Sequence, residues 1–138
     1  MRGRQYRAKR QRDRRSPTIL IVEDVRDQRE MYASYFAAKG FNVYTARDGL
    51  VALRLAHTAM PDVIVMDMSI PHLDGWETTN RLKGDLKTAH IPIIACSAHV
   101  IGGAAERALV AGCDAYVSKP CLPEDLLREV RRLLARAA

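Results

Sequence analysis

The sequence predicts a doubly wound α/β fold, in which a five-stranded parallel sheet lies between two layers of helices. Two observations lead to this prediction. Short apolar runs rich in Val and Ile alternate five times with longer amphipathic stretches. The apolar runs are continuous, which is typical of strands that helices cover on both faces. Repeated strand–helix units with right-handed crossovers then give three layers.

Each strand of this pattern is followed by a helix. The expected strands are TILIV at 18–22, NVYTA at 42–46, VIVM at 63–66, IPIIACS at 91–97 and AYVS at 115–118. The helices are expected over 27–39, 49–59, 76–83 and 104–111, and from Pro123 onward. Helix-end residues agree with these bounds, since Gly40 and Gly112 follow the first and fourth helices and Pro123 opens the last.

Charge divides the chain into two parts. Eight of the 22 Lys and Arg residues lie in the first fifteen positions, against one acid, Asp13. This segment lacks hydrophobic periodicity, so we expect residues 1–16 to form a basic, disordered arm and residues 17–138 to form one domain. The arm could be a solvated tail, a segment that binds phosphates of nucleic acid or of anionic lipid, a contact for a protein partner, or the result of a start codon assigned too early.

Composition excludes several classes of protein. No run approaches the roughly 18 apolar residues of a membrane span, and no apolar stretch follows the basic N-terminus as in a secretory signal. A cytoplasmic protein is therefore expected. Three cysteines without a CxxC pair indicate neither a disulfide framework nor a zinc site. A redox role for Cys96 or Cys121 stays open, because thiol reactivity depends on pKa and exposure.

Acidic residues close two of the expected strands. Glu23 and Asp24 follow the first strand, and Asp67 ends the third. Ligands of open α/β sheets bind beyond the carboxyl ends of the strands, where the strand order reverses. If these strands are neighbours, three carboxylates converge and repel one another unless a cation neutralises them. Carboxylates without nearby His or Cys indicate a hard ion, and a site completed by water and phosphate oxygens suits Mg²⁺ better than Ca²⁺.

Two further strand ends carry complementary groups. Ser97 closes the fourth strand, and Lys119 follows the fifth. A hydroxyl, an ammonium and a metal-bound carboxylate around one point could bind and stabilise a phosphoryl group. The chemistry that this set indicates is phosphoryl transfer to a carboxylate.

In these residues the chain resembles the receiver domain of two-component response regulators, of the single-domain CheY-like kind. The matching pieces are Glu23-Asp24 after ILIV, Asp67 in VIVMDMSIPHLDG, Ser97-Ala98, and Tyr116 with Lys119-Pro120 in AYVSKP. The resemblance runs from Pro17 to the C-terminus and implies a flavodoxin-like sheet with strand order 2-1-3-4-5. The chain departs from the family pattern in having Glu23 where Asp is commoner and Ile70 where Met or Leu is usual.

The resemblance implies a role for each acidic residue. Asp67 would accept a phosphoryl group from a phosphohistidine on a sensor histidine kinase or a histidine phosphotransfer protein. Asp24, Asp67 and the backbone carbonyl of Ser69 would bind Mg²⁺ directly, and Glu23 would act mainly through water.

The resemblance also implies a switch. Lys119 would pair with a phosphoryl oxygen, and its bond to Pro120 would be cis. Ser97 would hydrogen-bond the phosphoryl group and draw its loop inward, which leaves space for the Tyr116 ring. After Pro120 the sequence shows only one amphipathic helix, so the expected output is a change in affinity for an unknown downstream protein. That protein would bind the fourth helix, fifth strand and fifth helix of a monomer or weak dimer.

Two rival functions differ in class from this signalling switch. A haloacid-dehalogenase-like phosphohydrolase also uses an aspartyl nucleophile, but it needs a second Asp two residues later as proton donor, and this chain has Asp67-Met68-Ser69. We therefore expect no enzyme with a turnover substrate. The other rival is a phosphorylation-controlled binder of nucleic acid or membrane that acts through the basic arm.

Overall fold

The sheet has the architecture that the sequence predicts. The structure is a computed structural model that describes residues 5–6, 16–98, 103, 107, 109 and 111–137. Within these residues, five parallel strands are β2 (Thr18–Val22), β3 (Asn42–Ala46), β4 (Val63–Asp67), β5 (Ile93–Ser97) and β6 (Ala115–Ser118). They lie in the order β3-β2-β4-β5-β6, which is 2-1-3-4-5 when these five strands are counted along the chain. The predicted fold class and strand order are confirmed.

A two-residue strand of the arm, β1 (Gln5–Tyr6), adds an antiparallel edge to the sheet beside β3. Gln5 pairs with Tyr44, and Tyr6 pairs with Val43. No strand is predicted here from the sequence, because strand prediction rests on runs of apolar side chains, whereas this pairing joins two backbones. The other arm residues before Ser16 lie outside the described residues, so the disorder of the arm stays a prediction.

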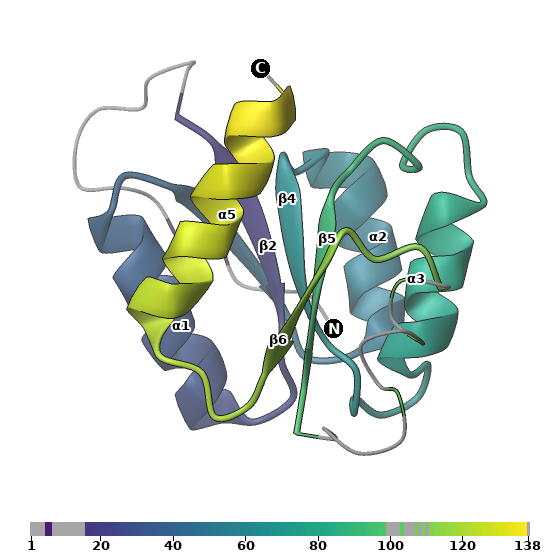
Figure 1. The fold of residues 1–138 in the computed structure, drawn as a ribbon, viewed down its shortest axis with the longest axis horizontal. Coiled ribbons are helices and arrows are strands. Elements are labelled where there is room, and N and C mark those ends of the chain that lie inside the picture. The colour runs from purple at the N-terminus through teal and green to yellow at the C-terminus, as the bar shows by residue number, and fades with distance from the viewer. Residues whose placement is uncertain are drawn as a thin grey trace.

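Helices cover both faces of the sheet (Figure 1). Those with full bounds are α1 (Arg26–Ala38), α2 (Gly49–Ala59), α3 (Gly75–Lys83) and α5 (Pro123–Ala137). Each begins within one residue of its predicted start. Figure 1 shows α1 and α5 on one face and α2 and α3 on the other. In the predicted helix 104–111, Arg107, Leu109 and Ala111 are helical, and its other residues lie outside the described part of the chain.

Each strand contributes side chains to two cores, one on each face of the sheet. Ile19 and Ile21 of β2 pack in the core that α1 and α5 cover. Leu20 and Val22 pack in the core on the α2 and α3 side. This two-sided burial explains why the strands read as continuous apolar runs.

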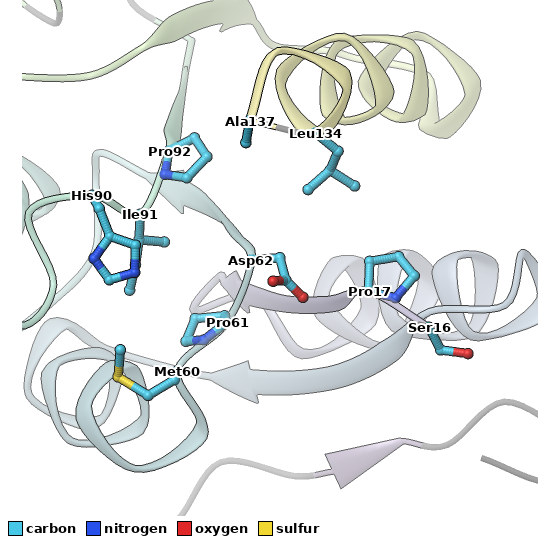
Figure 2. A pocket seen from close by; sticks show the side chains of 10 residues that line it. All are labelled: Ser16, Pro17, Met60, Pro61, Asp62, His90, Ile91, Pro92, Leu134 and Ala137. Atoms are coloured by element: carbon cyan, nitrogen blue, oxygen red, sulfur yellow. The ribbon is translucent and has the colours of Figure 1, made fainter. Parts of the chain in front are cut away.

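An open cavity of about 540 Å³ lies at the amino edge of the sheet. Figure 2 shows residues that precede β2, β4 and β5 lining it, together with Leu134 and Ala137 at the end of α5. The acidic residues singled out above lie at the opposite, carboxyl ends of the strands, so this cavity takes no part in their site.

Gly75 places the start of α3 directly behind the end of β4. The Asp74 side chain caps the helix by accepting a hydrogen bond from the Glu77 amide at 2.8 Å. A Cβ atom on Gly75 would lie 2.6 Å from the Cα of Met68 and 2.7 Å from the carbonyl oxygen of Asp67. Both are backbone atoms and cannot rotate away, so this helix start requires glycine.

Gly75→Ala should therefore lower the free energy of unfolding by about 1–3 kcal/mol, which is the typical cost of overpacking. Urea denaturation measures the change. Gly84→Ala is the matched control, because the residue has φ −84° and the nearest atom to its added Cβ lies 3.2 Å away. Equal losses in the two variants would contradict the close approach of α3 to β4.

Candidate functional site

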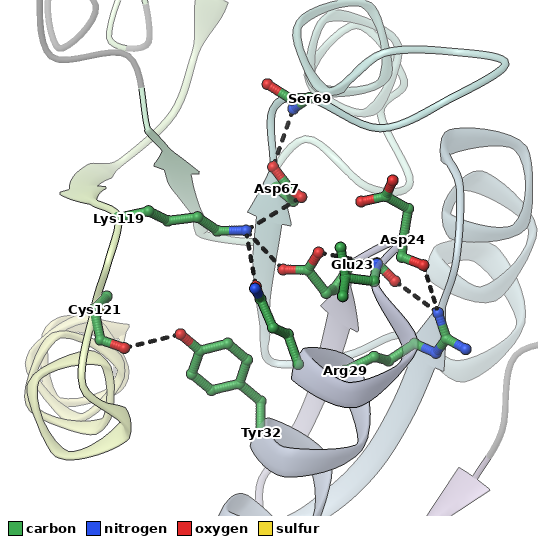
Figure 3. Close-up of polar contacts among 10 residues, drawn as sticks. Glu23, Asp24, Arg29, Tyr32, Asp67, Ser69, Lys119 and Cys121 are labelled. Carbon is green, nitrogen blue, oxygen red and sulfur yellow. Dashed lines mark hydrogen bonds and ion pairs between the residues drawn. The ribbon is translucent and has the colours of Figure 1, made fainter.

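Three carboxylates converge where β2 and β4 end side by side. Glu23 and Asp24 follow β2, and Asp67 is the last residue of β4. A carboxylate oxygen from each lies within 4.8 Å of the other two (Figure 3). Neighbouring parallel strands carry their carboxyl ends to the same edge, and this places residues that are far apart in the sequence at one point.

The Lys119 ammonium lies between two of these carboxylates. Glu23 is 2% exposed and Asp67 is 6% exposed, whereas Asp24 faces solvent. The Lys119 Nζ donates to Glu23 Oε1 at 2.7 Å and to Asp67 Oδ2 at 3.3 Å. Buried charges are tolerated when they are paired and hydrogen-bonded, and the ammonium provides both kinds of interaction.

The pKa values of this cluster show how strongly its charges interact. Burial raises the pKa of Glu23 to about 7, and the charge of Asp67 acts in the same direction, while the hydrogen bond from Lys119 opposes them. Burial lowers the pKa of Lys119, but hydrogen bonds and charges from Glu23 and Asp67 outweigh it, and the pKa is raised. Lys119 is therefore positively charged at neutral pH.

Backbone contacts fix the position of the Asp67 carboxylate. The Met68 amide donates to the Cys96 carbonyl at 3.0 Å, which extends the pairing of β4 and β5 past Asp67. The Ser69 amide donates to Asp67 Oδ1 at 3.0 Å. One carboxylate oxygen therefore contacts an amide and the other contacts the Lys119 ammonium (Figure 3).

The fourth and fifth parallel strands bring Ser97 and Lys119 to the same edge. Ser97 ends β5 and is 1% exposed. The Lys119 amide donates to the Ser97 carbonyl at 2.9 Å, so the two residues are tied through the backbone. The Lys119–Pro120 peptide bond is cis, as the resemblance implied.

Tyr116 and the cysteines lie beside this site. The Tyr116 ring is half-buried on β6 and packs against the core that α2 and α3 cover. Burial is the main cause that raises the pKa of the Cys96 and Cys121 thiols, so little thiolate is present at neutral pH. This weakens the redox role that the sequence left open.

Two residues of α1 contact the site although the sequence did not single them out. The Arg29 Nη1 donates to the backbone carbonyl of Glu23 at 2.9 Å and to that of Asp24 at 3.3 Å. Lys119 also donates to Gln28 Oε1 at 3.4 Å. Gln28 and Arg29 lie in the first turn of the helix that follows the acidic pair, and this position was the one sequence feature that could have indicated the contacts. It is a weak indication, because many helices carry polar residues in their first turn.

The donor set suits a hard divalent cation. The side-chain ligands that converge are carboxylate oxygens, which Mg²⁺ prefers, and the exposed carboxylate of Asp24 leaves one side open to water. Glu23 faces Lys119 instead, which fits a contribution to metal binding through water.

Comparison with known proteins identifies the family. The sequence model of the response regulator receiver domain matches residues 19–131. The polar-differentiation response regulator DivK of Brucella anthropi is 36% identical over 120 residues, which cover 87% of this chain and 98% of that protein. The chain belongs to the response regulator receiver domain family, and this membership implies phosphorylation-dependent signalling.

Solved structures agree with this assignment. The receiver domain of Francisella response regulator 1452 matches with a TM-score of 0.83 and 29% identity, and the match covers 89% of this chain and all of that one. The receiver domain of the sensor histidine kinase PA1611 from Pseudomonas aeruginosa has a TM-score of 0.80 and 31% identity, over 87% of this chain and 98% of that one. That structure holds a magnesium ion in its active-site cleft.

In metal-free protein, the free energy of unfolding should fall as the pH rises from about 5 to about 7. Folded Glu23 keeps a proton in this range that the unfolded chain, with a pKa near 4.5, has released, so protonation favours the folded state. Urea denaturation in chelator at several pH values measures the slope.

Glu23→Gln is the control for this slope. His57, whose pKa is raised mainly by its hydrogen bond to the Leu53 carbonyl and also by Asp85, acts in the same direction near neutral pH in both proteins. The difference between the two slopes therefore isolates Glu23. Identical slopes in the two proteins would show that the pKa of Glu23 is not raised in the folded chain.

Proposed function

We propose that this chain is a signalling switch that accepts a phosphoryl group on Asp67 from a histidine kinase or a histidine phosphotransfer protein. The observation that supports this most strongly is the Asp67 carboxylate itself. It is nearly buried at a strand end, 3.3 Å from the Lys119 ammonium and within 4.8 Å of two other carboxylates. An ordinary structural aspartate needs no such surroundings.

In the proposed reaction, an Asp67 oxygen attacks the phosphorus of a phosphohistidine. A phosphorus–oxygen bond forms as the phosphorus–nitrogen bond breaks, and its electron pair stays on the imidazole, which takes up a proton. Lys119 then moves one of its hydrogen bonds to a phosphoryl oxygen, and Ser97 donates its hydroxyl to another. Hydrolysis of the acyl phosphate by water returns the switch to its resting state.

Mg²⁺ is the proposed cofactor. Asp24, Asp67 and the backbone carbonyl of Ser69 would hold it directly, with Glu23 acting through water. When bound, it neutralises the carboxylates and the phosphoryl oxygens that approach them. The magnesium ion in the PA1611 receiver structure supports this assignment.

The proposed output is a change in affinity at one face of the domain. This face comprises the fourth helix, β6 and α5, which correspond to the fourth helix, fifth strand and fifth helix expected from the sequence. Ser97 and Tyr116 lie on adjacent strands, β5 and β6, so a shift at Ser97 can reach the Tyr116 ring. A partner that selects the phosphorylated surface must in return stabilise that state.

Three further predictions concern the location of the protein in the cell, its oligomeric state and the function of the arm. In the part of the chain that the structure describes, each helix is too short or too polar to span a bilayer. A cytoplasmic location and a monomer or weak dimer stay predictions. The arm-based alternative gains no support from the family match, which begins at residue 19.

With Mg²⁺ and a small phosphodonor such as acetyl phosphate, the chain should gain one phosphoryl group that is stable in acid and labile to base and hydroxylamine. Intact-protein mass spectrometry measures it. Asp67→Asn should remove the label because it removes the nucleophile, whereas Asp27→Asn, an exposed position in the first turn of α1, should keep it. Undiminished labelling of Asp67→Asn would exclude the assignment.

Activation with beryllofluoride should increase capture of a downstream protein in pull-downs, and Tyr116→Ala should lose this gain. Tyr35→Ala is the matched control, since Tyr35 is another half-buried tyrosine that lies on α1. If partners bound equally with and without activation, and a chain starting at Ser16 lost them, the arm would be the effector.

A further inference from the structure

The Arg29 side chain holds the loop that carries the acidic pair. Its Nη1 donates to the carbonyl of Glu23 at 2.9 Å and to the carbonyl of Asp24 at 3.3 Å. Its backbone amide donates to the Val25 carbonyl at 2.9 Å as the first turn of α1 closes. One residue therefore contacts three successive carbonyls of the loop, and Figure 3 shows the guanidinium lying against its backbone.

The rest of this loop has few other tethers among the described residues. The Glu23 amide donates to the Ala46 carbonyl at 2.9 Å, which ties the loop to the end of β3. The Val25 amide donates to Glu23 Oε2 at 3.2 Å. Val25 is the N-cap of α1, and its side chain makes no capping hydrogen bond. The Asp24 carbonyl thus depends on Arg29 for its position.

The charge of Arg29 alone would work against a metal site. A guanidinium bound to the loop that carries Glu23 and Asp24 repels any further cation that binds their carboxylates. Its hydrogen bonds act in the opposite direction, because a fixed loop backbone keeps Glu23 and Asp24 facing Asp67 and removes the cost of ordering them when an ion binds. The two effects have opposite signs, so an affinity measurement separates them.

We propose that Arg29 is a positioning residue of the cation site, which acts by holding the Glu23 and Asp24 carbonyls in place. This inference rests on the proposed Mg²⁺-dependent function and adds a residue to it. In this role Arg29 supplies no ligand to the ion, and it acts through the backbone that carries two of the carboxylates.

Calorimetric titration of the full chain with Mg²⁺, without a phosphodonor, tests this role. Arg29→Met keeps the aliphatic stem and removes the donors, and it should weaken Mg²⁺ binding about tenfold, as loss of an outer-shell contact commonly does. Arg29→Lys keeps the charge without the guanidinium geometry and should lie between Arg29→Met and the unaltered chain. Melting curves in chelator check that each variant is folded.

Arg26→Met is the matched control. Arg26 is exposed on the same helix, and its side chain makes no hydrogen bond or ion pair with the part of the chain that the structure describes. Removing this charge should leave Mg²⁺ affinity unchanged or slightly raised. The proposal is overturned if folded Arg29→Met binds Mg²⁺ at least as tightly as Arg26→Met.

If Arg29→Met does not fold, Arg29→Lys decides the question. Weakened binding in that variant supports the positioning role, and wild-type affinity overturns it. Labelling of the unaltered chain with acetyl phosphate, measured in parallel, tests the proposed function separately. If the unaltered chain is not labelled but the variants differ in Mg²⁺ affinity as predicted, Asp67 is not the phosphoacceptor. The positioning role of Arg29 is then still supported.

Discussion

The burial of two carboxylates side by side is the constraint on which the rest of this domain depends. Glu23 and Asp67 repel each other where water provides little screening, and burial shifts the pKa of Glu23 accordingly. The Lys119 ammonium relieves this repulsion from a position 96 residues further along the chain than Glu23. One ammonium offsets only part of the charge of three carboxylates, so the cluster can still attract a divalent cation.

Hydrogen bonds between the ends of neighbouring strands keep these repelling charges in a fixed geometry. The backbone amides of Glu23, Met68 and Lys119 each donate to a carbonyl at or next to the end of a neighbouring strand. The accepting carbonyls are those of Ala46, Cys96 and Ser97. The functional side chains thus project from a hydrogen-bonded rim instead of from free loops. Such support is what a site needs when its groups must act within a fraction of an ångström.

Local sequence patterns predicted most of the fold but only part of the site. Burial on both faces gives the strands their continuous apolar runs, and the acidic residues at strand ends follow from the topology of a parallel sheet. The pairing of β1 with β3 and the contacts of Arg29 were not predicted. Both involve backbone carbonyls, which every residue type carries, so the residue types at these positions do not indicate the contacts. The exposed Asp24 and the buried Glu23 are adjacent in the sequence, and only the folded chain distinguishes their environments.

When a cation is bound, a phosphoryl group on Asp67 is proposed to take over one of the hydrogen bonds that Lys119 makes to Glu23 and Asp67. A crystal structure of the chain with Mg²⁺ and beryllofluoride tests this most directly. The account predicts beryllium bonded to an Asp67 oxygen, Mg²⁺ on Asp24 and Asp67, and the Lys119 Nζ within hydrogen-bond distance of a fluorine. An adduct on another residue, or Lys119 still bound only to Glu23 and Asp67, would contradict it.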